Sequence, residues 1–253
     1  IYHKPYSVWL HTKLPKNYLH SEHGRKMGLV IADDLCQSFI CVSKNVELDV
    51  VTTFGLSPKI TTVYPAVYTA QRFEFKSSSK CSTDILFAGR LAKEKGADIF
   101  IKAFAKLLQK RPETTATIIG DGEEKKPLVA LATKLGIMRS LRFLPHCERT
   151  DLFTHIINCR VFSIASRTES FCITLAEALA LGATTVAPNI GGPAEIHSLG
   201  RFGYLFKPED SGSLARTFEI ALRKKTTSTL SQKLFAMRHF DATKQFNILS
   251  NLL

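Results

Sequence analysis

The sequence predicts an α/β fold in which helices cover both faces of a parallel sheet. From residue 84 onward, short apolar segments alternate with longer amphipathic segments. The apolar segments are continuous runs, which is typical of strands that are buried on both faces. Glycine follows several of them, as a tight strand-to-helix turn requires. Strands that alternate with helices in this way form parallel sheets.

Each predicted strand of this region is a short apolar run bounded by turn residues. The strands are expected at 84–89, 115–120, 141–144, 161–165, 184–187 and 204–206. The segments between them carry apolar residues at helical spacing and predict helices at 96–110, 123–135, 149–157 and 173–181. Gly136 and Gly182 are placed to end two of these helices. In such a sheet, ligands bind beyond the carboxyl ends of the strands.

Residues 1–75 show a second α/β pattern that is too short for a complete domain. It predicts strands at 8–11, 39–43 and 60–67. It also predicts helices at 22–37 and at 44–54, the second of which is capped by Ser43. A polar, Ser-rich segment follows and predicts a linker. We therefore expect an incomplete first domain at 1–75, a linker at 76–83, a second domain at 84–239 and a terminal amphipathic helix at 240–253. Because the chain begins with Ile1 and not Met, it is expected to be a fragment or a processed product.

The net charge of +12 favours an anionic partner. Nucleic acid, an anionic membrane surface and anionic small molecules are the three candidates. The lysines and arginines are spread along the chain, without a basic stripe interleaved with aromatic residues, which argues against nucleic acid. No apolar run reaches the roughly 18 residues of a membrane-spanning helix.

The six cysteines form no CxxC pair. Several lie in apolar segments, so we expect free buried thiols in a reducing, cytoplasmic compartment, and neither disulfides nor a zinc site.

Two glutamates mark the most informative segment of the chain. Glu169 falls in the predicted loop before a helix, and Glu177 falls inside that helix, with seven residues between them. A helix N-terminus presents unpaired backbone N–H groups and a partial positive charge, which suits a phosphate. Carboxylates beside it suit sugar hydroxyls. Together these features predict a nucleotide-sugar site.

Two further turns are expected at the same edge of the sheet. Gly89 lets the backbone approach a ligand, and Arg90 and Lys95 after it can bind two phosphate groups. The alternative for this turn is a pair of solvated basic side chains. Gly120, in Gly-Asp-Gly, follows the next strand, but turns of this kind are common in α/β proteins.

Two weaker candidates lie elsewhere. Glu195 follows a Gly191-Gly192 turn and could line the same cleft, or the turn could simply precede a short helix. His11 ends a predicted strand and could face an acceptor. Because Trp9 and Leu10 precede it, His11 could equally be a buried structural histidine.

Taken in order, these motifs resemble those of the retaining glycosyltransferases of family 4, which have the GT-B architecture of two Rossmann-like domains. The resemblance covers about residues 39–253. It is carried by four ordered motifs: Gly89-Arg90 with Lys95-Gly96, Gly120-Asp121-Gly122, Glu169-Ser170-Phe171 with Glu177-Ala178, and Gly191-Gly192 with Glu195. It implies that the incomplete domain is the acceptor-side one and that the last helix crosses back onto it.

The resemblance also implies roles for the site residues. Arg90 and Lys95 would bind the donor diphosphate and stabilise it as it leaves, beside the backbone of Gly89 and Gly120. The sugar and ribose contacts would come from Glu169 (sugar hydroxyls), Glu177 (ribose hydroxyls), His11 (opposite the sugar) and the backbone around Phe171, Cys172, Ile173 and Thr174. The base would be read near residues 143–147.

The implied reaction moves a sugar from a nucleotide-diphosphate donor to a hydroxyl acceptor with retention of configuration and without an essential metal or other cofactor. UDP, GDP and ADP sugars remain open as donors. Glycans, lipids and small molecules remain open as acceptors, and an anionic membrane remains open as a peripheral contact. Two residues depart from the family pattern: Cys172 replaces a glycine, and Thr184 replaces a proline.

Because of Cys172 and the incomplete first domain, two alternatives are kept. One is a non-catalytic homologue that only binds nucleotide, and the other is a sugar-nucleotide epimerase of the same fold.

Overall fold

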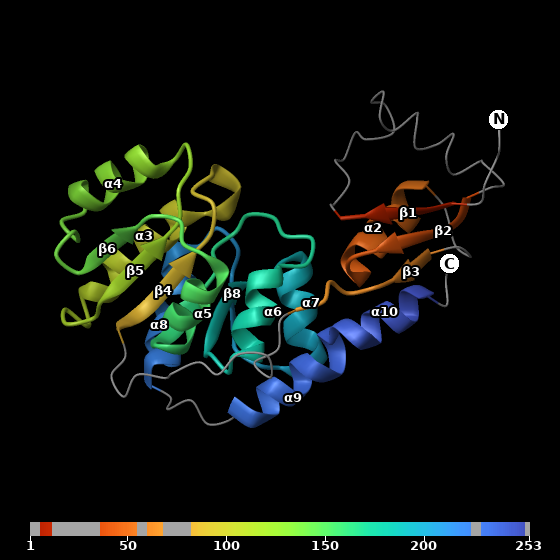
Figure 1. The fold of residues 1–253 in the computed structure, drawn as a ribbon. Helices are drawn as coiled ribbons and strands as arrows, with labels where there is room; N and C mark the ends of the chain where they lie inside the picture. The colour runs from red at the N-terminus through yellow and green to blue at the C-terminus, as the bar shows by residue number, and fades with distance from the viewer. Residues whose placement is uncertain (1–5, 12–35, 55–59, 68–81, 224–228, 251–253) are drawn as a thin grey trace.

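The computed structural model describes residues 6–11, 36–54, 60–67, 82–223 and 229–250 (Figure 1). Within them, two parallel sheets form the frame of the molecule. The smaller sheet has the order β1-β2-β3, and the larger one has the order β6-β5-β4-β7-β8-β9. The strands are β1 Tyr6–Leu10, β2 Cys36–Cys41, β3 Ile60–Thr62, β4 Thr83–Ala88, β5 Ala116–Ile119, β6 Leu141–Leu144, β7 Cys159–Ser163, β8 Thr185–Pro188 and β9 Tyr204–Phe206.

Helices connect the strands and cover both faces of the larger sheet (Figure 1). The helices are α2 Lys44–Phe54, α3 Ala97–Leu108, α4 Lys125–Lys134, α5 Arg149–Ile157, α6 Ile173–Ala180, α7 Gly191–Gly200, α8 Ser211–Arg223, α9 Thr229–Phe240 and α10 Ala242–Ser250, with a 3₁₀ turn at Lys93–Lys95. No described helix combines the length and the apolar character that crossing a bilayer requires.

The strand order of the larger sheet determines where a ligand can bind. The chain starts at the centre with β4, moves outward through β5 to β6, and then returns to β7 on the other side of β4. In a doubly wound sheet, the crevice beyond the carboxyl ends of the two central strands is the usual ligand site. Here those strands are β4 and β7, and the loops after them carry Arg90 and Glu169.

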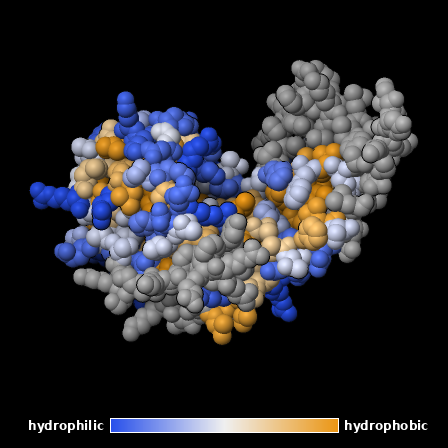
Figure 2. Space-filling model, viewed as in Figure 1, coloured by the Kyte–Doolittle hydropathy of each residue, from blue (hydrophilic) through white to orange (hydrophobic). Residues whose placement is uncertain are grey.

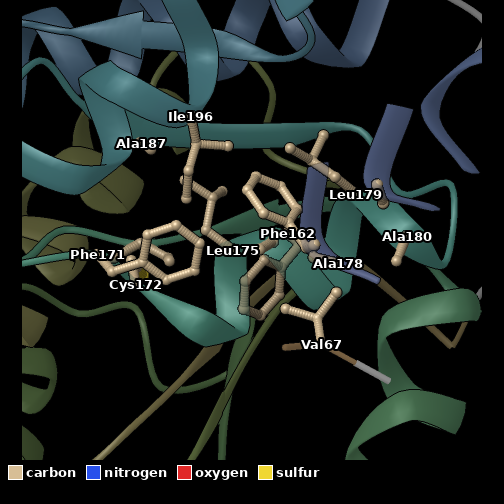
Figure 3. Close-up of a cluster of buried hydrophobic side chains, with 14 of the residues drawn as sticks. Val67, Phe162, Phe171, Cys172, Leu175, Ala178, Leu179, Ala180, Ala187 and Ile196 are labelled. Carbon is tan, nitrogen blue, oxygen red and sulfur yellow. The ribbon is translucent and has the colours of Figure 1, made fainter. Parts of the chain in front are cut away.

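Two buried clusters fill the faces of the larger sheet. Alternate residues of β4 point to opposite sides: Phe87 joins one cluster with α3 and α8, and Leu86 joins the other with α5 and α6. The second cluster continues into the smaller sheet, since Cys41 and Val46 belong to it. Figure 3 shows Val67 of the smaller half beside side chains of α6 in this cluster. One continuous core therefore holds the smaller half against α6.

The surface follows from this layering. In Figure 2, the visible face of the larger half is mainly hydrophilic, as expected where amphipathic helices turn their polar sides outward. Hydrophobic residues gather on the visible face of the smaller half, over the β1–β3 sheet and beside the atoms drawn in grey.

Several predicted boundaries in the smaller half are wrong. Residues 36–37, expected at the end of a helix, begin β2, while 22–35 lie outside the described residues. The strand expected at 60–67 ends at Thr62. The reason is that its partner β2 ends at Cys41, whose carbonyl accepts the Val63 N–H at 2.9 Å as the last rung.

The C-terminal segment also differs from the prediction. Instead of one helix at 240–253, α9 and α10 meet at Asp241. The Asp241 carboxylate accepts the N–H groups of Thr243 (3.0 Å) and Lys244 (3.1 Å), which caps α10 and separates it from α9. The predicted linker at 76–83 lies mostly outside the described residues, although Thr83 already belongs to β4. The domain division therefore stays a prediction.

Candidate functional site

Two pockets open at the carboxyl ends of the central strands, and Thr174 in the first turn of α6 lines both. The first, which we call the β4–β5 pocket, has a volume of about 470 Å³ and is lined by Ala88, Gly89, Arg90, Ile119, Gly120, Asp121, His146, Cys147, Leu152 and Thr174. The second, the intersheet pocket, has a volume of about 340 Å³ and is lined by His11, Val42, Pro65, Lys95, Glu169, Ser170, Phe171, Cys172, Ile173 and Thr174. Most of the predicted site residues line one of these pockets; the exceptions are Glu177 and the weaker candidate Glu195.

The floor of the β4–β5 pocket depends on Gly120. This residue has a φ of +148°, and a Cβ on it would lie 2.0 Å from the carbonyl oxygen of Gly89. The turns after β4 and β5 therefore pack backbone against backbone, which only glycine permits here. As predicted, both turns lie at the same edge of the sheet.

The rim of the same pocket is fixed by Asp121. Its carboxylate accepts the backbone N–H of His146 at 2.9 Å and also binds the Lys125 ammonium. The pKa of Asp121 is lowered, first by the bond from Lys125 and then by the bond from His146. This contact places His146 and Cys147 at the pocket wall, inside the segment where base contacts are expected.

Lys95 and Glu169 form one ion pair in the intersheet pocket. The Lys95 ammonium lies 2.7 Å from Glu169 Oε1, and the Ser166 hydroxyl donates to the same oxygen at 2.8 Å. The side chain of Glu169 is 12% exposed and that of Lys95 is 31% exposed. Two residues that the sequence placed in separate motifs are thus a partly desolvated pair at the crevice between β4 and β7.

Arg90 is exposed and pairs with the carboxylate of Glu94. The pKa of Glu94 is lowered, first by a bond from its own backbone amide and then by the charge of Arg90. The Arg90 side chain remains at the rim of the β4–β5 pocket.

Glu177 is buried, with 3% of its surface exposed, and it does not line either pocket. Its carboxylate pairs with the guanidinium of Arg149, which also lies 5.7 Å from the ring centre of Phe153. Sequence reasoning missed Arg149. Arg149 is the first residue of α5, where a basic side chain interacts unfavourably with the helix dipole. This position could have indicated that Arg149 pairs with a carboxylate elsewhere.

Cys172 immediately precedes α6 in a left-handed conformation, with φ +80° and ψ +74°. Glycine adopts this region at little cost, whereas other L-residues are strained in it. Figure 3 shows Cys172 beside Phe171 at the edge of the buried cluster. Burial raises the pKa of its thiol well above the usual value. The cysteine therefore keeps a glycine-like backbone and adds a buried thiol to the wall of the intersheet pocket.

Glu195 does not line either pocket, so its predicted place in the cleft is corrected. Its carboxylate accepts the N–H groups of Lys44 at 2.7 Å and Asn45 at 3.0 Å, and the hydroxyl of Tyr64 at 2.8 Å. The first turn of α2 presents unpaired N–H groups and a partial positive charge, which attract a carboxylate. Glu195 therefore joins the two halves of the molecule.

His11 is exposed at the end of β1, and its ring stacks on Trp9 with centroids 5.2 Å apart. Since Trp9 is itself 44% exposed, the interpretation of His11 as a buried structural residue is wrong. His11 lines the intersheet pocket, as the loop of Glu169 does.

Cys41, Cys147, Cys159 and Cys172 are free thiols; Cys41, Cys159 and Cys172 are buried as predicted, whereas Cys147 is half-buried. In those same parts of the chain, no cluster of three or more His, Cys, Asp or Glu side chains could hold a metal ion.

Solved structures share this arrangement. The Anabaena protein HepE in complex with UDP matches 98% of this chain and 71% of its own, with a TM-score of 0.83 and 22% identity. Sucrose-phosphate synthase from Thermosynechococcus elongatus matches 97% of this chain and 66% of its own, with a TM-score of 0.81 and 16% identity. These likenesses establish the α/β fold of the GT-B type.

Similarity in sequence identifies the family. Glycogen synthase of Mycobacterium tuberculosis is 31% identical over 180 residues, which are 70% of this chain and 44% of that enzyme. The D-inositol 3-phosphate glycosyltransferase of Streptomyces scabiei is 34% identical over 141 residues, which are 52% of this chain and 31% of that enzyme. The chain thus spans less than half the length of these relatives. The family described as "Glycosyl transferases group 1" matches residues 70–234, and the chain belongs to this glycosyltransferase family.

Proposed function

We propose that this chain is the donor-binding part of a retaining glycosyltransferase that moves a sugar from a nucleotide diphosphate to a hydroxyl acceptor. The observation that carries the proposal is the Lys95–Glu169 ion pair in the crevice between β4 and β7. It lies beside the N-terminus of α6, where backbone N–H groups favour a phosphate. A cation for the leaving diphosphate and a carboxylate for the sugar are thereby adjacent.

In this proposal, the β4–β5 pocket holds the nucleotide. The backbone at Gly89 and Gly120 lets the diphosphate approach closely, and Arg90 at the rim supplies a bidentate cation. His146 and Cys147 border the base. That HepE was solved with UDP and with UDP-glucose supports a uridine donor for this chain.

The intersheet pocket would hold the sugar. Glu169 accepts bonds from its hydroxyls, the backbone amides from Phe171 to Thr174 contact sugar and phosphate, and His11 faces the sugar from the other side. Cleavage of the anomeric C–O bond places negative charge on the departing diphosphate. Arg90 at the exposed rim and Lys95 in the partly desolvated ion pair stabilise that charge, so no metal is required.

Glu177 is assigned to the ribose hydroxyls. In the structure its carboxylate is occupied by Arg149, so the proposed role requires this side chain to move or to share the carboxylate with ribose. The side chain of Arg149 is 48% exposed, which leaves it room to turn away.

The acceptor-side domain is proposed to include residues 1–75, and the acceptor to be a glycan, a lipid or a small molecule. The enzyme is proposed to be cytoplasmic, and the charge of +12 supports contact with an anionic membrane surface. A non-catalytic homologue would bind the donor but neither transfer nor hydrolyse its sugar. An epimerase would convert the donor without any acceptor.

Saturation-transfer NMR on this chain with UDP-, GDP- and ADP-sugars tests the proposal. Lys95→Met should weaken binding of the preferred donor at least tenfold, because it removes a cation from the diphosphate and leaves Glu169 without its ion-pair partner. Lys102→Met is the matched control, since Lys102 forms an exposed ion pair with Asp98 on α3. Absence of binding to every donor by the folded chain, or equal binding by both variants, would contradict the proposal.

A further inference from the structure

The loop that carries Glu169 is held from two sides. On one side, the N–H of Gly192 at the start of α7 donates to the carbonyl of Glu169 at 3.0 Å. On the other side, the hydroxyl of Ser43 donates to the carbonyl of the next residue, Ser170, at 2.6 Å. The second contact crosses 127 residues of sequence and joins the smaller half to the loop.

Ser43 is completely buried and uses its hydroxyl twice. Besides donating to Ser170, the oxygen accepts the N–H of Val46 at 3.2 Å, which caps α2. The cap was predicted from sequence, but the bond to Ser170 was not. The Ser43 side chain therefore links the start of α2 directly to the backbone of the Glu169 loop.

The neighbouring contacts fix Ser43 itself. Glu195 holds the N–H groups of Lys44 and Asn45, the two residues that follow Ser43. The ring of Tyr64 stacks on Phe171 at 5.6 Å and donates its hydroxyl to Glu195. The start of α2 is thus locked to both α7 and the Glu169 loop.

We propose that Ser43 is a positioning residue for the sugar-binding carboxylate Glu169. Its hydroxyl bond to Ser170 sets the backbone of the loop, so the smaller half determines how well the site holds the sugar moiety of the donor. The inference rests on the proposed function and adds a residue that acts through the loop without touching the substrate.

The two pockets predict a selective effect. His11, Val42 and Pro65 of the smaller half line the intersheet pocket, whereas the residues that line the β4–β5 pocket all belong to the larger half. Loss of the Ser43 hydroxyl should therefore weaken binding of a nucleotide sugar more than binding of the nucleoside diphosphate, which also has contacts in the β4–β5 pocket. A general loss of folding would weaken both.

The test uses isothermal titration calorimetry with UDP and UDP-glucose, GDP and GDP-mannose, and ADP and ADP-glucose, and continues with the pair that the native chain binds best. Ser43→Ala should weaken the nucleotide sugar about five- to tenfold and the diphosphate less than twofold. Asp241→Ala is the control, because it removes the cap of α10 without touching the loop. It should lower the melting temperature similarly and leave both affinities unchanged.

A measurement on the native chain covers the case in which Ser43→Ala does not fold. The amide resonances of Lys44 and Val46 should shift when the nucleotide sugar binds and stay in place with the diphosphate alone. Equal effects on sugar and diphosphate, or unmoved amides, would overturn the role of Ser43 while leaving the proposed function intact. If the native chain binds none of the six ligands, the proposed function fails and this inference with it.

Discussion

The β4–β5 pocket and the intersheet pocket meet at Thr174 but are built in different ways. The first is lined by the ends of β4 and β5, by the turns after β4, β5 and β6, and by one residue each of α5 and α6, all in the larger half. The second needs residues from both sheets, and side-chain bonds such as Ser43 to Ser170 hold its parts together. Under the proposed function, we therefore expect mutations in the smaller half to affect binding of the sugar more than binding of the nucleotide.

The largest effect expected at neutral pH comes from a mutation that disrupts the β4–β5 pocket. Gly120→Ala places a Cβ against the Gly89 carbonyl and should cost about 3 kcal/mol of unfolding free energy and abolish UDP binding. Gly136→Ala is the matched control, because Gly136 also has a positive φ but a Cβ there meets no atom within 4 Å. Denaturant unfolding and UDP titration measure both. Equal losses in the two variants would show that backbone strain, and not turn packing, shapes the pocket.

The next largest effect is expected from Glu195→Ala, which should loosen the intersheet pocket. Glu195→Ala leaves the Tyr64 hydroxyl and two N–H groups of α2 without their acceptor and should cost about 2 kcal/mol. Binding of a nucleotide sugar should weaken, while UDP binding should stay within twofold of the native value. Glu209→Ala, which removes an exposed carboxylate 3.6 Å from Arg167, is the control. Loss of UDP affinity in Glu195→Ala would show that the two pockets are not separable.

The next prediction concerns the smaller half and the pH dependence of its stability, which we expect to follow the thiol of Cys41. Burial raises the pKa of the Cys41 thiol from 9.0 to about 12. Because the pKa of Cys41 is higher in the folded than in the unfolded chain, burial of the neutral thiol contributes fully to the free energy of unfolding below pH 9. This contribution is lost as the pH rises from about 9 to 12, and the free energy of unfolding falls by up to about 1.4 kcal/mol per pH unit. Cys41→Ala should flatten this part of the profile of unfolding free energy against pH. A profile as steep as that of the native chain would contradict the assignment.

The smallest effect concerns Cys172. Replacement by glycine relieves a left-handed cysteine but removes a buried side chain and adds freedom to the unfolded chain. These terms oppose each other, so Cys172→Gly should change the unfolding free energy by less than about 1 kcal/mol, as measured in denaturant. Affinity for the nucleotide sugar should be kept or improved, since the wall of the intersheet pocket loses a thiol. A large loss of affinity would show that the cysteine is itself part of the sugar site.

Sequence reasoning predicted the larger sheet well because its strands are continuous apolar runs separated by amphipathic helices. It missed α8, although Leu214, Phe218 and Leu222 repeat at helical spacing along it. It placed Arg90 and Glu169 at the same edge of the sheet, because the carboxyl ends of parallel strands share one edge. That β4 and β7 are neighbours is known only from the structure. The smaller half was predicted less well, since its strands are short and their ends depend on pairing across the sheet.

Contacts between segments that lie far apart in the sequence could not be predicted from the sequence. The Arg149–Glu177 pair joins two helices, and Glu195 reaches the start of α2 across 150 residues. The residues next to a charged side chain in the sequence do not indicate which residue it will pair with. Such pairs can therefore be identified only in the folded structure. The sequence contained one local signal, because Arg149 lies at the N-terminus of α5, where a basic residue is unfavourable.

The most direct test of the account is a crystal structure of this chain with UDP. We expect the diphosphate against Gly89 and Arg90, the base beside His146 and Cys147, and the ribose hydroxyls on Glu177 after Arg149 has turned away. The intersheet pocket should remain open for the sugar. UDP bound elsewhere, or a ribose remote from a Glu177 that still pairs with Arg149, would contradict the assignment of the β4–β5 pocket to the nucleotide.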